Sequence, residues 1–176
     1  MKAILVMGIG NTLLSDEGIG LHVLEAVRAS LPDTSGVTFL DGGTLSFVLA
    51  ADIAAADALI VIDAARLDAE PGTVRCFDGE AMDTFLTSGR LSVHEVGLAD
   101  LIDMARLTGD LPVSRALIGI QPESVDWGMQ PSDAVAASVS RAAARVVELI
   151  ERWRGDEVVP VAASDRASAV STGEGR

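Results

Sequence analysis

Cysteine, basic residues and long apolar runs are all scarce in this chain of 176 residues. Cys76 is the only cysteine, so the chain cannot form an intrachain disulfide. No apolar run approaches the ~20 residues that a bilayer-spanning helix needs, and no signal-peptide pattern follows Met1. We therefore expect a protein of the cytoplasm, with no membrane partner.

Positive charge is scarce as well. The chain has 13 Lys and Arg residues against 26 Asp and Glu residues, which gives a net charge of −13. Such a charge opposes non-specific binding to nucleic acid and to anionic lipid. We expect neutral or basic partners and no nucleic acid, although strong acidity also serves solubility.

Common hydrolase motifs are missing too. The sequence has no Gly-x-Ser-x-Gly elbow, no His-Glu-x-x-His pair and no cysteine with a convincing histidine partner. Cys76 lies in an apolar strand and is expected to be a packed thiol. His22 is expected to be an ordinary residue of the first helix. Ordinary nucleophilic or zinc-protease chemistry is therefore not indicated.

Apolar strands alternate with amphipathic helices along the chain, which favours an α/β fold with a mostly parallel sheet covered on both faces. The length suits a single domain over residues 1–155. An extra strand over 73–77 could pair antiparallel at an edge. The main strands are expected over 2–8, 37–40, 58–62 and 116–120, and the helices over 19–31, 44–54 and 94–107 and from Ser132 onward.

Two expected helix starts depend on polar residues that can cap them. Thr44 can cap the helix that reaches Ala54, and Ser132 can cap one long final helix that carries Trp153. Residues 156–176 show no apolar period and are expected to form a disordered tail.

A glycine-rich run follows the first strand and resembles a nucleotide-binding loop. Gly8 and Gly10 fit a dinucleotide fingerprint, but Leu13 occupies the place of its third glycine. Asp16 and Glu17 would also repel a bound pyrophosphate at the helix start. A cation or a basic peptide therefore suits this loop better than a nucleotide.

Acidic residues follow three successive strands, where the ligand crevice of a doubly wound sheet lies. Asp16 and Glu17 follow the first strand, Asp41 the second and Asp63 the third, while His94 begins a later helix. Carboxylates with an imidazole suit a borderline divalent metal such as nickel or zinc. Two alternatives to a metal site stay open. These aspartates could cap the segments that follow them, or two of them could form an aspartic dyad.

Five motifs in this order resemble the nickel-iron hydrogenase maturation endopeptidases, over almost all of residues 2–155. The motifs are Gly8-Ile9-Gly10-Asn11 with Leu14-x-Asp16-Glu17-Gly18-Ile19-Gly20, Asp41-Gly42-Gly43-Thr44, Ile62-Asp63-Ala64, His94-x-x-Gly97-Leu98-Ala99-Asp100 and Gly119-Ile120-Gln121-Pro122-Glu123.

The resemblance implies a single three-layer α/β domain of the phosphorylase/hydrolase type. It also implies a peptidase that removes the C-terminal peptide of the hydrogenase large-subunit precursor after nickel insertion. The nickel would be supplied by that substrate and contacted by Glu17, Asp63 and His94.

The same resemblance leaves the catalytic group undecided between metal-assisted and aspartic-type hydrolysis, with Asp16, Asp41 and Asp63 as candidates. Asp16 and Asp41, together with Asn11, also match positions that support the loops. A monomer is expected. The competing functions are a nucleotide- or phosphate-dependent α/β enzyme and a non-catalytic nickel-sensing chaperone of the large subunit.

Overall fold

The fold is built on one mixed sheet. The structure, a computed structural model, describes residues 2–44, 48–88 and 93–155, and the side chains of residues 93–96 lie outside that description. Within these ranges the strands follow the order β2-β1-β3-β5-β4. The strands are β1 (Ile4–Ile9), β2 (Val37–Gly43), β3 (Ala58–Ala64), β4 (Val74–Asp78) and β5 (Ser114–Ile120).

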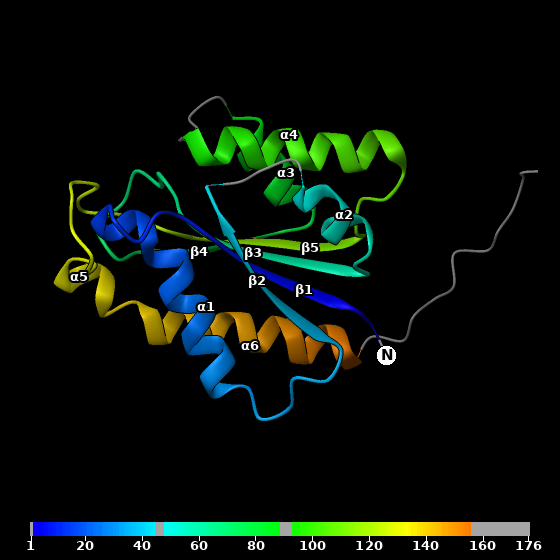
Figure 1. Ribbon diagram of the computed structural model, residues 1–176, viewed down its shortest axis with the longest axis horizontal. Coiled ribbons are helices and arrows are strands. Elements are labelled where there is room, and N and C mark those ends of the chain that lie inside the picture. Colours follow the sequence, from blue (N-terminus) through cyan, green and yellow to red (C-terminus); the bar gives the residue numbers. More distant parts are fainter. Residues whose placement is uncertain (1, 45–47, 89–92, 156–176) are drawn as a thin grey trace, which may run out of the picture.

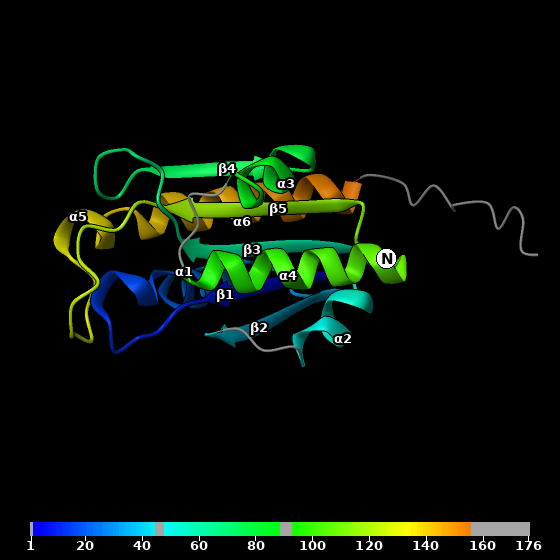
Figure 2. The same cartoon turned by 90° about the horizontal axis from the view of Figure 1, so that it is seen from above.

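Helices cover both faces of the sheet (Figures 1 and 2). Helices α1 and α6 pack on one face, and α2, α3 and α4 pack on the other. The short helices η1 and α5 lie beyond the carboxyl ends of the parallel strands. The helices are η1 (Ser15–Gly18), α1 (Ile19–Ser30), α2 (Leu49–Ala54), α3 (Glu80–Leu86), α4 (Val93–Thr108), α5 (Asp133–Ala136) and α6 (Val139–Gly155).

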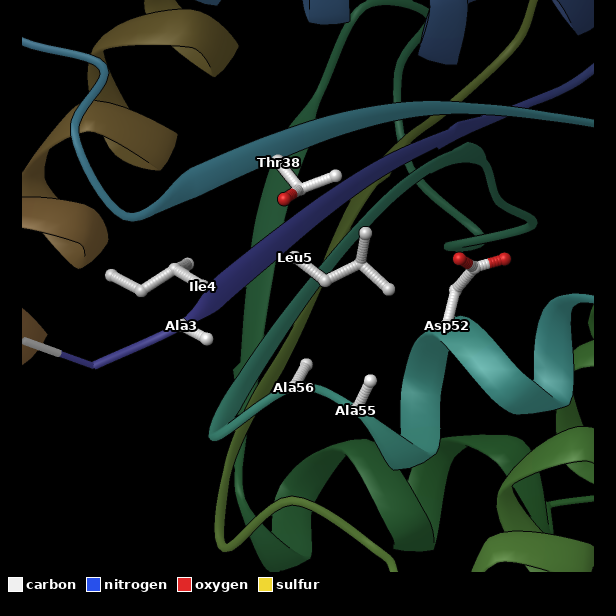
Figure 3. Close-up of a pocket in the computed structure, with 7 residues that line it drawn as sticks. All are labelled: Ala3, Ile4, Leu5, Thr38, Asp52, Ala55 and Ala56. Carbon is white, nitrogen blue, oxygen red and sulfur yellow. The ribbon is translucent and has the colours of Figure 1, made fainter.

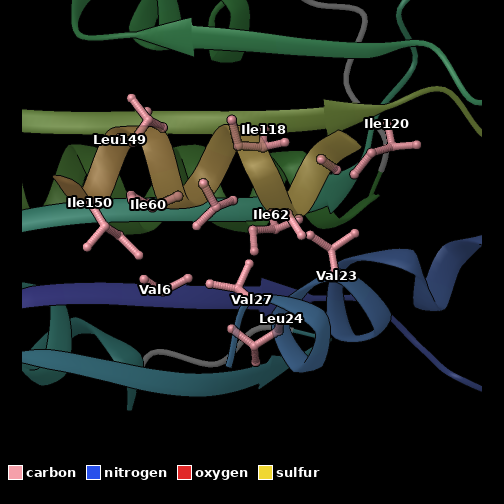
Figure 4. Close-up of a cluster of buried hydrophobic side chains, with 14 of the residues drawn as sticks. Val6, Val23, Leu24, Val27, Ile60, Ile62, Ile118, Ile120, Leu149 and Ile150 are labelled. Carbon is pink, nitrogen blue, oxygen red and sulfur yellow. The ribbon is translucent and has the colours of Figure 1, made fainter. Parts of the chain in front are cut away.

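Strand alternation divides the core into two clusters. In β1, Ile4 and Val6 face α1 and α6, whereas Leu5 and Met7 face the other helix layer. Figure 4 shows the first cluster, where side chains of β1, β3 and β5 meet those of α1 and α6. Because both faces are buried, the central strands carry continuous apolar runs, such as residues 4–7 of β1 and 58–62 of β3.

This arrangement confirms the predicted fold class. Strands β1, β2, β3 and β5 pair in parallel, and β4 pairs antiparallel with β5 at one edge, as expected for residues 73–77. Helices α1 and α4 match the predicted ranges 19–31 and 94–107 closely. Within the described ranges, no helix is both long enough and apolar enough to cross a bilayer.

One expected helix start was wrong, and the final helix, which does start after Ser132, is not continuous. Helix α2 begins at Leu49, with Val48 and not Thr44 in the capping position, and residues 45–47 lie outside the description. The final helix is divided into α5 and α6. The buried Ser138 hydroxyl donates to the carbonyl oxygen of Val135 at 2.6 Å, and this local bond competes with a continuous helix.

Helix α3 was not predicted, because it has only seven residues and follows the left-handed turn at Gly79. It is fixed to β5 by Asp83, whose two carboxylate oxygens accept from Arg115 at 2.9 and 2.6 Å. The predicted tail over 156–176 lies outside the described residues and stays a prediction.

Candidate functional site

The loop after β1 folds back so closely that its own backbone fills its interior. Gly10 has φ of +137°, and a Cβ there would stand 1.8 Å from the carbonyl oxygen of Glu17. A Cβ on Gly20 would stand 2.2 Å from the Ile9 oxygen and 2.4 Å from the Ile62 oxygen. These glycines therefore allow η1 and α1 to contact β1 and β3, and they do not form a cradle for phosphate.

Asp16 is the most heavily hydrogen-bonded carboxylate of this loop, and it is fully buried. It accepts from the backbone N–H groups of Glu123 at 2.8 Å, Ser124 at 2.9 Å and Ser132 at 2.6 Å. The Ser132 hydroxyl donates to it at 2.9 Å, so this hydroxyl contacts Asp16 and does not cap α5. Burial alone would raise the pKa of Asp16, but the hydrogen bonds outweigh it and lower the pKa below its usual value.

The residues that hold Asp16 belong to the connection between β5 and α5, called here the strap (residues 121–132). The strap also pairs with the first loop through its backbone. Ser15 N–H donates to the Gly128 oxygen at 2.7 Å, and Gly128 N–H donates to the Leu13 oxygen at 3.0 Å. The two loops, far apart in sequence, therefore lie side by side at the carboxyl end of the sheet (Figure 1).

Asp63 occupies the penultimate position of β3 and is completely buried. Val61 lies on the α4 side of the sheet, so strand alternation places Asp63 on that side as well. Glu17 is half-buried in η1, which is in contact with β3. Asp63 and Glu17 thus come from neighbouring elements at the carboxyl end of the parallel strands.

His94 lies in the first turn of α4, but its side chain is outside the described part of the structure. Figures 1 and 2 show that α4 begins at the carboxyl end of the parallel strands. The three elements that carry Glu17, Asp63 and His94 therefore converge there. Among the side chains that the structure does describe, no three His, Cys, Asp or Glu residues form a metal-binding group.

Asp41 has different surroundings from Asp63. It is exposed at the end of β2, and its Oδ1 accepts from the Gly43 N–H at 2.8 Å, which closes a local turn. Asp41 pairs with Gly8 and so lies on the α1 side of the sheet, since Phe39 packs there. Asp41 and Asp63 therefore approach from opposite faces, which disfavours a dyad made by these two residues.

Cys76 and His22 lie where the sequence predicted, one in a strand and one in a helix. Cys76 is half-buried on β4 and packs against the core between the sheet and α6. Burial raises the pKa of the Cys76 thiol, and a protonated thiol is a poor nucleophile. His22 lies within α1, as expected for an ordinary helical residue.

A small surface pocket of about 110 Å³ lies elsewhere, against the amino-terminal half of β1 (Figure 3). Among the described residues that line it, Asp52 alone is charged. The pocket is lined by Ala3, Ile4, Leu5, Thr38, Asp52, Ala55 and Ala56. It lies away from the carboxyl ends of the strands, where the candidate site residues are, and its described lining carries no cluster of reactive groups.

Sequence reasoning missed the polar residues of the strap. Ser124 and Ser132 lie 108 and 116 residues after Asp16, and neither stands in a pattern that predicts contact with it. The motif Gly119-Ile120-Gln121-Pro122-Glu123 covers the start of the strap, but it includes neither serine. Gln121 anchors the start of the strap, because its side-chain oxygen accepts from the Leu67 N–H at 2.7 Å.

Known proteins share both the sequence and this fold. The family model for hydrogenase maturation proteases matches residues 21–149. The hydrogenase 2 maturation protease of Escherichia coli K12 is 38% identical over 161 residues, which is 89% of this chain and 95% of that protein. The hydrogenase expression/formation protein HoxM of Cupriavidus necator is 34% identical over 96% of this chain and 84% of its own length.

Solved structures agree with the sequence matches. The hydrogenase maturating endopeptidase HybD from E. coli superposes with a TM-score of 0.79 at 36% identity, over 87% of this chain and 94% of that one. The [NiFe] hydrogenase maturation protease HybD from Thermococcus kodakarensis gives 0.69 at 30% identity, over 87% and 99%. The chain therefore belongs to the hydrogenase maturation protease family.

Proposed function

We propose that this protein is the endopeptidase that removes the C-terminal peptide of a [NiFe] hydrogenase large-subunit precursor after nickel insertion. The observation that carries the proposal is the convergence of η1 with Glu17, β3 with Asp63 and the first turn of α4 at the carboxyl end of the parallel strands. Family membership supplies the peptidase activity and the class of substrate.

Nickel belongs to the substrate in this proposal. Carboxylate oxygens and an imidazole nitrogen suit a borderline divalent ion, and the oxygens would come from Glu17 in η1 and Asp63 in β3, two elements in contact. Two carboxylates leave coordination positions open, so His94 and the ligands of the precursor would complete the shell. The bound ion would then report that the precursor is ready for cleavage.

We further propose metal-assisted hydrolysis over an aspartic-type reaction. Asp16 is unsuited to be a general base, because four hydrogen bonds occupy its carboxylate and hold its pKa low. Asp41 closes a turn on the other side of the sheet. Asp41 and Asp16 position the loops. Asp63 and Glu17 orient the nickel-bearing end of the precursor.

The loop geometry argues against the nucleotide-dependent alternative. A phosphate needs space beside glycine backbone N–H groups, and the backbone of Glu17 occupies the space beside Gly10. We therefore expect equilibrium dialysis to detect no binding of NAD or ATP. Saturable binding of either nucleotide would contradict this part of the proposal.

The activity is tested by incubating the purified protein with a nickel-loaded large-subunit precursor and following the precursor by mass spectrometry. We expect one product that has lost a short C-terminal peptide. Glu17→Gln is the matched inactive control, since it keeps the size of the side chain and removes its charge. Tight binding without any cleavage would favour the chaperone alternative.

We also propose that the protein acts in the cytoplasm and as a monomer. Sedimentation of the purified protein tests the oligomeric state.

A further inference from the structure

Large apolar side chains are exposed on the two loops that frame the proposed site. The described residues include seven exposed large hydrophobic side chains, and four of them lie on these loops. They are Leu13 at 48%, Val125 at 53%, Trp127 at 83% and Met129 at 70% exposure. The other tryptophan, Trp153, is packed in the core at 4% exposure. An exposed cluster of this kind marks an interaction surface.

The backbone brings these side chains together on one ridge, called here the apolar ridge (Leu13, Val125, Trp127 and Met129). Gly128, which lies between Trp127 and Met129, is paired with Leu13 and Ser15. The Ser15 hydroxyl also donates to the Asp126 oxygen at 2.9 Å. These bonds use backbone groups almost throughout, so they hold the ridge in place and leave its side chains available for a partner.

Acidic residues accompany the ridge. Residues 10–18 and 121–132 contain four carboxylates, Asp16, Glu17, Glu123 and Asp126, and no Lys or Arg. Asp16 is satisfied internally, but Glu123 and Asp126 are exposed and Glu17 is half-buried. A partner that covers the ridge therefore needs an apolar pocket bordered by basic side chains.

The area of the ridge limits what can bind there. Its four side chains offer on the order of 400 Å², whereas a stable interface needs about 800 Å² from each partner. The ridge alone is too small for a permanent dimer of this chain. It suits a client that binds, is processed and leaves, and its preorganised backbone reduces the entropy lost on binding.

We infer that the apolar ridge docks the large-subunit precursor, with Trp127 inserted into an apolar pocket bordered by Arg or Lys side chains. The inference rests on the proposed function, because it places the same substrate on a surface beside the site. Glu17 follows directly on the loop that carries Leu13, and its N–H donates to the Leu14 oxygen at 3.0 Å. Docking on the ridge would thus bring the nickel-bearing end of the precursor to Glu17.

The test compares Trp127→Ser with Leu107→Ser, measuring both the dissociation constant for the precursor and its processing. Leu107 is 89% exposed in the last turn of α4, at the other end of that helix from His94, so it is a matched apolar control away from the ridge. Truncation of an interface hot spot costs about 2 kcal/mol, which corresponds to an affinity about 30-fold weaker. We expect that loss, and a matching rise in KM with little change in kcat, for Trp127→Ser only. Circular dichroism should be unchanged because Trp127 is exposed.

The possible outcomes separate docking from cleavage. Wild-type cleavage with equal precursor affinity in both variants would overturn the docking inference and leave the proposed function standing. Precursor binding that depends on Trp127 without any cleavage would support docking and contradict the peptidase assignment. Wild-type protein that neither binds nor cleaves the precursor would overturn both. If Trp127→Ser instead converts a wild-type dimer to a monomer, the ridge is a contact between copies of this chain and the inference is wrong.

Discussion

Asp16→Asn tests whether the charge of this carboxylate fixes the strap to the first loop. Oδ1 accepts from the Ser132 N–H, and Oδ2 accepts from the N–H groups of Glu123 and Ser124. An asparagine has only one oxygen, so either orientation of its amide places an NH₂ group against a backbone N–H. We expect the variant to remain folded but to be substantially less stable.

The size of this loss follows from the contacts. A hydrogen bond to a charged group contributes about 1.5–3 kcal/mol, and an unsatisfied buried donor costs about 1–3 kcal/mol. Because these terms are not additive, we expect a loss of about 3 kcal/mol in the free energy of unfolding, or about 6–12 °C in Tm. Ser132→Ala, which removes only the hydroxyl donor, should lose about 1.5 kcal/mol, the lower end of that range.

The pH dependence has a definite sign. The folded-state pKa of Asp16 is lowered, so its contribution to stability is complete above the unfolded value of about 4 and is lost as the pH falls through the folded value. Urea unfolding of wild type and Asp16→Asn should therefore differ most near neutral pH and converge in acid. Asp110→Asn, an exposed change at the amino end of β5, should match wild type throughout. Equal stability of Asp16→Asn and wild type at neutral pH would refute the reasoning.

Five further changes test the site, the loop and the tail. Glu17→Gln, Asp63→Asn and His94→Ala should each preserve the circular dichroism spectrum while uncut large subunit accumulates on a gel, and normal processing in all three would refute the site. Gly20→Ala should lower the free energy of unfolding by more than about 3 kcal/mol or prevent folding, because its Cβ would overlap two carbonyl oxygens of β1 and β3. Native-like urea unfolding of that variant would contradict the packing argument. Truncation after Gly155 should change neither solubility nor processing, and loss of either would show that residues 156–176 dock on the domain or on the client.

The sheet could be predicted from the sequence because its interior strands are buried on both faces. Residues such as Val6 and Ile60 belong to continuous apolar runs, and this pattern identifies parallel strands between helix layers. Short elements were harder to predict from the sequence. Helix α3 depends on Asp83, which pairs with Arg115 across 32 residues, and no local pattern predicts such a contact.

The sequence predicted which candidate residues follow the strands, but not how those residues lie relative to one another. Asp41 and Asp63 both follow apolar strands, but only the paired register shows that they lie on opposite faces. Asp16 was predicted both as a catalytic candidate and as a support for the loops, and its donors come from the strap, more than 100 residues away in the chain. Contacts over that distance depend on the fold as a whole, so the sequence alone could not distinguish a buried anchor from a catalytic carboxylate.

The central claim is that this protein cleaves the precursor in response to nickel contacted by Glu17, Asp63 and His94. The most direct measurement compares nickel-loaded and nickel-free forms of the same precursor, each incubated with the purified protein and followed by mass spectrometry. The account predicts that only the nickel-loaded form loses its C-terminal peptide, and that casein is not cut. Equal cleavage of the two forms would contradict it.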